Sequence, residues 1–156
     1  MKRAFAALAL AGLLASPISC ARRTVEGRWH LDREHTTMPM GMKIPGESYL
    51  EIKLGGDGAD LRDFVSSPET GSQTLMDRHY PFGGKELEVE SDANGALYTS
   101  ARLEGTTLYT VERIVHRDPE AGPPEARTSV TYTVSWTGLQ LTGTDESGKV
   151  AVYDRQ

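Results

Sequence analysis

The residues best suited to metal chemistry lie together near the start of the chain. Two imidazoles and three thioethers fall within one short stretch, at His30, His35, Met38, Met40 and Met42. Soft thioethers combined with imidazole are ligands that suit Cu(I). Methionines also fill irregular apolar gaps well, and this spacing prescribes no ligand geometry. Copper binding by the Met/His segment is therefore an alternative function, while the sequence by itself assigns no metal ligand and no cofactor.

No other residue pattern in the chain indicates catalysis. Residues 143–149 read Gly-x-x-x-x-Gly-Lys, like the start of a phosphate-binding loop. That motif continues with Ser or Thr and a helix, whereas Val150 follows here and the chain ends soon after. The sequence has no Gly-x-Ser-x-Gly nucleophile motif and no His-Glu-x-x-His zinc motif. We therefore expect a protein that is not an enzyme.

The first nineteen residues are typical of a secretory signal peptide. Lys2 and Arg3 supply a positive start, and residues 4–15 form an uncharged run of Ala, Leu, Phe and Gly. This run is shorter than the roughly 20 residues that cross a bilayer. We predict that residues 1–19 are a signal peptide, and that residues 20–156 form the mature domain in the periplasm or cell envelope.

Cys20 is the only cysteine in the chain, and it lies at the predicted cleavage point. A cysteine there, preceded by the small Ser19, resembles the lipidation site of bacterial lipoproteins, whose thiol receives a diacylglycerol. The alternative is ordinary cleavage after Ala21. Lipidation would make a membrane the partner of the chain through Cys20. A single cysteine permits no disulfide within the chain, so burial must stabilise the fold.

Length and charge restrict the mature chain further. The residues after position 19 fall within the usual length of one domain. The full chain has a formal net charge of −5, and removal of Lys2 and Arg3 makes the mature chain more acidic. Arg22 and Arg23 are its only basic cluster. Because nucleic-acid binding needs a basic face, we exclude nucleic acid as a partner.

Apolar and polar residues alternate along most of the mature chain with a period of two. The alternation is clearest where Val130, Tyr132, Val134 and Trp136 are interleaved with Thr and Ser. Similar runs occur at residues 25–31, 50–54, 87–89, 97–103, 108–114, 139–141 and 150–152. Such alternation is typical of strands with one face on a core and one in water. The many carboxylates fall on the polar phase, which we expect to be solvated.

Glycine-containing turns separate these runs. Asn94-Gly95, Ser147-Gly148 and the Gly-rich residues 55–58 each lie between two alternating segments, and such pairs favour tight hairpins. Strands joined in order by hairpins form a meander, and a long meander normally closes because closure removes its exposed edges. We predict an all-β fold, an antiparallel meander of eight to ten strands closed into a barrel.

Four short motifs follow one another along the mature chain. They are Gly27-Arg28-Trp29, Tyr80-Pro81-Phe82-Gly83-Gly84-Lys85, Ser135-Trp136-Thr137-Gly138-Leu139 and Val152-Tyr153-Asp154-Arg155. Their order and spacing resemble those of the bacterial secreted lipocalin-like proteins in the calycin group. The resemblance implies a lipocalin-like barrel with a small-molecule cavity, and it implies no reaction. It also implies that Trp29 closes one end of the barrel, with Arg155 packed across its ring.

From these observations we predict a binding protein for a small lipophilic molecule. By the alternation, the inward ligand-binding candidates are Leu97, Tyr132 and Trp136, with Tyr109 as a further candidate. Tyrosine suits such a site because it combines an apolar ring with a polar hydroxyl. The alternative is a structural or envelope-interaction lipoprotein whose interior is filled, since an eight-stranded barrel is either packed or holds one small ligand.

Overall fold

The computed structural model describes residues 24–37, 46–118, 120 and 122–156. The predicted signal peptide, Cys20, Met38, Met40 and Met42 lie outside the described residues. Within the described residues, no helix has the length and hydropathy needed to span a bilayer.

Ten strands make up the structure, which confirms the predicted all-β meander. They are β1 (Gly27–Asp32), β2 (Glu47–Leu54), β3 (Gly58–Ser67), β4 (Gly71–Pro81), β5 (Leu87–Ser91), β6 (Gly95–Glu104), β7 (Thr107–His116), β8 (Glu125–Val134), β9 (Gln140–Asp145) and β10 (Val150–Arg155).

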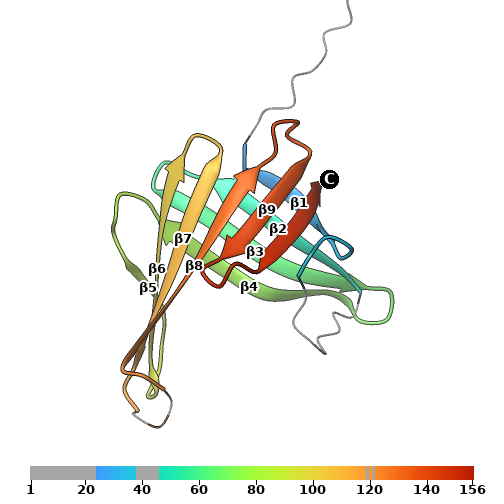
Figure 1. The fold of residues 1–156 in the computed structure, drawn as a ribbon. Coiled ribbons are helices and arrows are strands. Elements are labelled where there is room, and N and C mark those ends of the chain that lie inside the picture. Colours follow the sequence, from blue (N-terminus) through green and yellow to red (C-terminus); the bar gives the residue numbers. More distant parts are fainter. Residues whose placement is uncertain (1–23, 38–45, 119, 121) are drawn as a thin grey trace, which may run out of the picture.

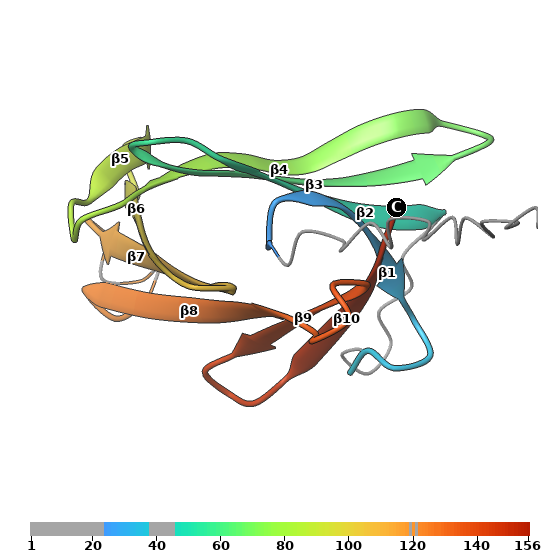
Figure 2. The ribbon, with the colours of Figure 1, turned by 90° about the horizontal axis from the view of Figure 1, so that it is seen from above.

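The strands form one antiparallel sheet that curves into a nearly closed barrel (Figures 1 and 2). Strands that are consecutive in the chain pair with each other throughout, except for β4 and β5, and the first strand β1 pairs with the last strand β10. The ladder is therefore interrupted only between β4 and β5. There β4 lies against both β5 and β6, so the sheet almost completes the circle.

One end of the barrel, which we call the closed end, is sealed by Trp29. This is the end at which β1 begins and β10 finishes, beside the β2–β3, β6–β7 and β8–β9 turns. The Trp29 ring is fully buried, and its Nε1 donates a hydrogen bond of 2.9 Å to the Val25 carbonyl. The guanidinium carbon of Arg155 lies 4.3 Å from the ring centroid, so the contact implied by the resemblance is present.

Behind Trp29, apolar side chains from most of the strands fill the closed end. The largest of them are fully buried: Leu50, Ile52, Leu61, Leu108 and Leu141. Nearer the opposite end, which we call the open end, several inward positions are polar or ionisable instead. The apolar core therefore occupies only part of the barrel, and the polar positions lie between it and the open end.

Candidate ligand-binding site

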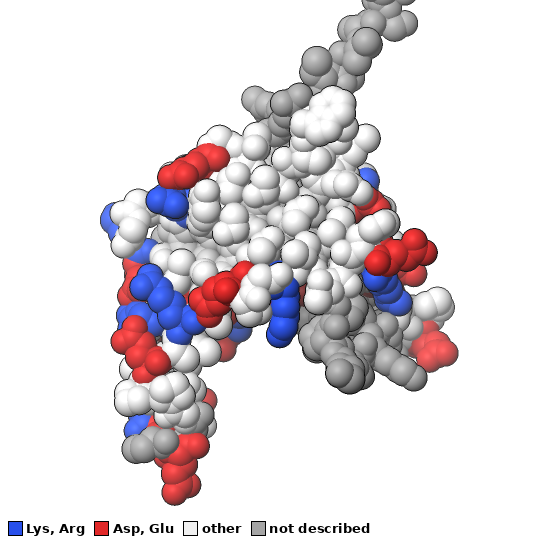
Figure 3. Space-filling view, viewed as in Figure 1, with Lys and Arg blue, Asp and Glu red and all other residues white. Residues whose placement is uncertain are grey.

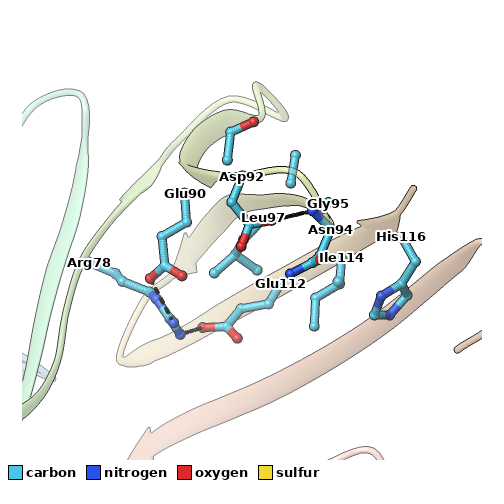
Figure 4. Close-up of a pocket in the computed structure, with 11 residues that line it drawn as sticks. Arg78, Glu90, Asp92, Asn94, Gly95, Leu97, Glu112, Ile114 and His116 are labelled. Atoms are coloured by element: carbon cyan, nitrogen blue, oxygen red, sulfur yellow. Dashed lines mark hydrogen bonds and ion pairs between the residues drawn. The ribbon is translucent and has the colours of Figure 1, made fainter. Parts of the chain in front are cut away.

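A cavity of about 640 Å³ lies at the open end, between β4 and the strands β5, β6 and β7 (Figure 4). Leu97 and Ile114 supply apolar surface, and Arg78, Glu90, Glu112 and His116 supply polar groups. Small-molecule sites typically measure roughly 300–1,000 Å³ and combine apolar walls with a few polar groups. The cavity has the size and lining of such a site.

Arg78 anchors a hydrogen-bonded network at the inner end of this cavity. Its Nη1 donates to Glu112 Oε1 at 2.9 Å, and its Nη2 donates to Glu90 Oε1 at 3.1 Å. The Tyr80 hydroxyl donates to the same Glu112 oxygen at 2.6 Å. Arg78 and Tyr80 are two residues apart on β4 and therefore share its inner face. Arg78 Nε is buried and has no hydrogen-bond partner among the described residues.

The Tyr80 hydroxyl is held in its protonated form by these surroundings. Burial raises the pKa of Tyr80 well above its usual value, and the hydrogen bond to Glu112 raises it further. Tyr80 thus acts as a hydrogen-bond donor to the carboxylate. The network is a fixed polar wall for the cavity, with no free nucleophile in it.

A smaller cavity of about 200 Å³ is lined by Tyr132 of β8 and Tyr153 of β10. Gly143 of β9 lies opposite Tyr132 in the ladder, and a Cβ atom at Gly143 would lie only 3.1 Å from the Tyr132 ring. The missing side chain at Gly143 therefore makes room for that ring. Among the described residues, neither tyrosine hydroxyl has a hydrogen-bond partner, and burial raises the pKa of both.

Asp63 places an additional carboxylate inside the barrel. It lies on the inner face of β3, paired with Leu50 on one side and Met76 on the other. Burial raises the pKa of Asp63 from 3.8 to about 6, against a smaller lowering by the Phe64 backbone N–H. The charge of Asp63 also contributes to the raised pKa of Tyr132 and of Tyr153. The carboxylate and the two tyrosines therefore share one interior.

The structure places two of the four predicted ligand-binding residues on the inner face. Leu97 lines the larger cavity and Tyr132 lines the smaller one. Their contact with a ligand stays a prediction.

The inward orientation predicted for the other two residues is wrong. Trp136 is 77% exposed, because β8 ends at Val134 and the alternation does not continue into the β8–β9 turn. Tyr109 follows the buried Leu108 on β7 and therefore points outward, where the Arg102 guanidinium lies 4.5 Å from its ring centroid.

The expectation that the strand carboxylates are solvated is also wrong for Asp63 and Glu112. A signal for Glu112 was present in the sequence. Residues 108–114 form one of the alternating runs, and Glu112 lies an even number of residues from the apolar Leu108 and Ile114, which places all three on one face of the strand. Asp63 and Arg78 lie on β3 and β4, where the sequence shows no comparable apolar alternation.

The two described histidines of the Met/His segment each contact a carboxylate. His30 Nε2 lies 2.5 Å from Glu47 Oε2, and His35 Nδ1 lies 2.6 Å from Asp32 Oδ2. In the described part of the chain, no three His, Cys, Asp or Glu side chains are grouped so that they could hold a metal ion. The three methionines lie outside it, so copper binding stays an untested alternative.

No known family model and no curated protein sequence matches the chain. Among solved structures, it is similar to secretory abundant heat soluble protein 4 from Ramazzottius varieornatus, with a TM-score of 0.51 and 18% identity over 84% of this chain and 94% of that chain. It also matches a point mutant of the fluorescent protein UnaG, with a TM-score of 0.48 and 16% identity over 84% and 95% of the two chains. The first likeness supports the antiparallel barrel fold.

Proposed function

We propose that the protein binds a small molecule inside the open end of the barrel and catalyses no reaction. The observation that carries this proposal is the cavity of about 640 Å³ between the apolar core and the open end. Because Trp29 and Arg155 occupy the closed end, a ligand would enter from the opposite side.

The lining favours a ligand that is largely apolar and carries one polar group. Leu97 and Ile114 would contact the apolar part. The inward polar groups, which include the hydrogen-bonded wall of Arg78, Glu112 and Tyr80, would orient the polar part, because few and fixed polar groups give such sites their specificity.

A dye titration tests this function. The mature protein carrying Cys20→Ala is titrated with Nile red, and decanol is then used to displace the dye. The fluorescence of the dye is the readout, since Trp136 lies in an exposed turn. We expect saturable binding at one site per chain, with displacement by decanol.

Two matched variants locate the binding. Leu97→Trp fills the larger cavity and should weaken dye binding by about tenfold or more. Leu139→Trp makes the same change at a 57% exposed position in the β8–β9 turn and should leave binding unchanged. Absence of saturable binding would favour the alternative of a filled, structural barrel. Equal binding by both variants would place the dye elsewhere.

For the location of the protein, we propose that Cys20 is lipidated and that the closed end faces the membrane. Arg155 Nη2 donates to the Thr24 carbonyl at 2.6 Å, and Arg155 Nε donates to the Gly138 carbonyl at 2.8 Å. The same guanidinium therefore joins the start of the described chain to the β8–β9 turn. Cys20 precedes Thr24 by four residues, a reach of at most about 14 Å.

The surface of the β8–β9 turn agrees with this orientation. Trp136 and Leu139 are 77% and 57% exposed. In Figure 3 the surface around this turn is almost free of charged side chains, whereas charges of both signs gather over the far ends of β5 to β8. Tryptophan is favoured at membrane interfaces, so a lipid on Cys20 would bring this turn to a suitable environment.

Fractionation and quenching test the anchor. Wild-type protein should sediment with membranes, and Cys20→Ala should move to the soluble fraction. In vesicles, brominated lipids should quench Trp136, while the buried Trp29 stays unaffected. Wild-type protein found wholly in the soluble fraction, with a free thiol at Cys20, would contradict the proposal.

A further inference from the structure

The inward charges at the open end are unequal in number. One guanidinium, that of Arg78, faces the carboxylates of Glu90 and Glu112. Asp63 adds a third carboxylate to the interior, so the net charge of these four groups is −2 when all are ionised. At the outer end of the smaller cavity, Asp145 and Lys149 offset each other. Among the described residues that face the interior, negative charges therefore outnumber positive ones.

Arg78 is already engaged by its two glutamates. Each of its Nη atoms donates to a different carboxylate, and charge-assisted hydrogen bonds of this kind are the strong ones. An anionic ligand would have to compete with Glu112 and Glu90 for this guanidinium. The Arg78 guanidinium is thus a poor receptor for a second anion.

Asp63, in contrast, lacks a cation of its own. In the described part of the chain, no Lys, Arg or His nitrogen lies within 4.0 Å of its carboxylate. An ionised carboxylate without a cation is unfavourable where it is shielded from water. A positively charged group that entered the barrel interior next to the inner face of β3 would relieve this cost.

Two inward tyrosines, on β8 and β10, share the interior of the barrel with Asp63. The rings of Tyr132 and Tyr153 line the smaller cavity, and their hydroxyls have no partner in the described residues. Aromatic ring faces attract ammonium groups, and the attraction grows when water is excluded. An interior that holds a carboxylate without a cation and two tyrosine rings is therefore suited to an amine, with the hydroxyls available as hydrogen-bond acceptors.

We propose that the barrel selects an amphipathic amine, a molecule with an apolar body and one ammonium group, with Asp63 on the inner face of β3 as the counter-charge and the rings of Tyr132 and Tyr153 in the same interior. This inference rests on the proposed function and names the class of its ligand. A fatty acid of the same length would add a negative charge to a negative interior, so it is disfavoured.

Three probes of equal chain length test the selectivity. Decylamine, decanol and decanoate displace Nile red from the mature Cys20→Ala protein at pH 8, below their micelle-forming concentrations. We expect decylamine to bind at least about tenfold more tightly than decanoate, with decanol between them, because the three share the same apolar chain length and their head groups carry opposite charges or none. Asp63→Asn should lower the affinity for decylamine by about tenfold and leave that for decanol unchanged.

The control variant is Asp77→Asn, which removes one negative charge from the outer face of β4, where the Asp77 side chain is 66% exposed. It should leave all three affinities unchanged, which separates Asp63 from the general acidity of the chain. Circular dichroism shows whether each variant is folded.

The failures of the two proposals are distinguishable. If decanoate binds as tightly as decylamine, or if Asp63→Asn leaves decylamine binding unchanged, the amine selectivity is overturned while the binding function stands. If neither the dye nor any of the three probes binds, the binding function is overturned as well.

Discussion

Replacing Asp63 with Asn should stabilise the barrel at neutral and alkaline pH. Burial raises the pKa of Asp63 from 3.8 to about 6, so the folded state favours the protonated carboxyl. The protonated Asp63 carboxyl makes its full contribution to the stability of the folded state below pH 3.8. This contribution is lost as the pH rises through about 6. Above that range the native state holds an ionised carboxylate without a cation. Asn has nearly the same shape and no charge to bury.

The pKa shift sets the size of the effect. The rise in the pKa of Asp63 from 3.8 to about 6 corresponds to about 3 kcal/mol, because each pKa unit is worth about 1.4 kcal/mol. Asp63 is only partly buried, so solvent screens part of this effect and we expect about half of it, about 1.5 kcal/mol. At pH 8 the free energy of unfolding of Asp63→Asn should exceed that of the unsubstituted domain by this amount. At pH 3.5 the two should be nearly equal.

Urea denaturation followed by circular dichroism measures both values. The other inward groups, Arg78, Glu90, Glu112, His116 and the tyrosines, are present in both proteins, so their titration largely cancels in the difference. Asp77→Asn is the control for removal of an exposed charge on the neighbouring strand. If the free energies of unfolding of Asp63→Asn and the parent differ by the same amount at both pH values, ionisation of Asp63 does not destabilise the native state. A variant that is less stable than the parent at pH 8 would contradict the prediction as well.

Three further substitutions test the packing by urea denaturation. Trp29→Ala should cost about 3–5 kcal/mol, because it removes a fully buried ring at the closed end; a cost below about 1 kcal/mol would contradict that role. Tyr80→Phe should cost about 1–2 kcal/mol, because Glu112 loses its hydroxyl donor; an unchanged stability would show that this hydrogen bond does not stabilise the fold. Gly143→Ala should cost about 1–3 kcal/mol through its contact with the Tyr132 ring, and Tyr132→Leu should recover part of the loss; equal losses in the single and double variants would assign the cost to the backbone.

The fold could be predicted from the sequence where apolar and polar residues alternate strictly along a strand. In β8, apolar residues face the core and Thr and Ser face outward, so alternation alone identifies the strand. In β3 and β4, two inward positions carry Asp63 and Arg78, and the ladder is shifted between Asp63 and Phe64. These strands interrupt the apolar alternation because their inner faces line the polar part of the interior.

The candidate site was predictable only in part. Leu97 and Tyr132 follow the alternation and lie inside. The inward orientation predicted for Trp136 is wrong because the sequence does not show that β8 ends at Val134, two residues earlier. Glu112 meets Arg78 and Tyr80 across the opening between β4 and β5, and such a contact depends on barrel closure rather than on any local pattern.

Chemical-shift mapping of the mature Cys20→Ala protein with decylamine shows directly whether a small molecule binds inside the open end. We predict saturable shifts of the Leu97, Ile114 and Tyr132 amides, which belong to the strands that line the two cavities, and no shift at Trp136 or Leu139. Shifts confined to the exposed β8–β9 turn, or no saturable shift at all, would contradict binding inside the open end.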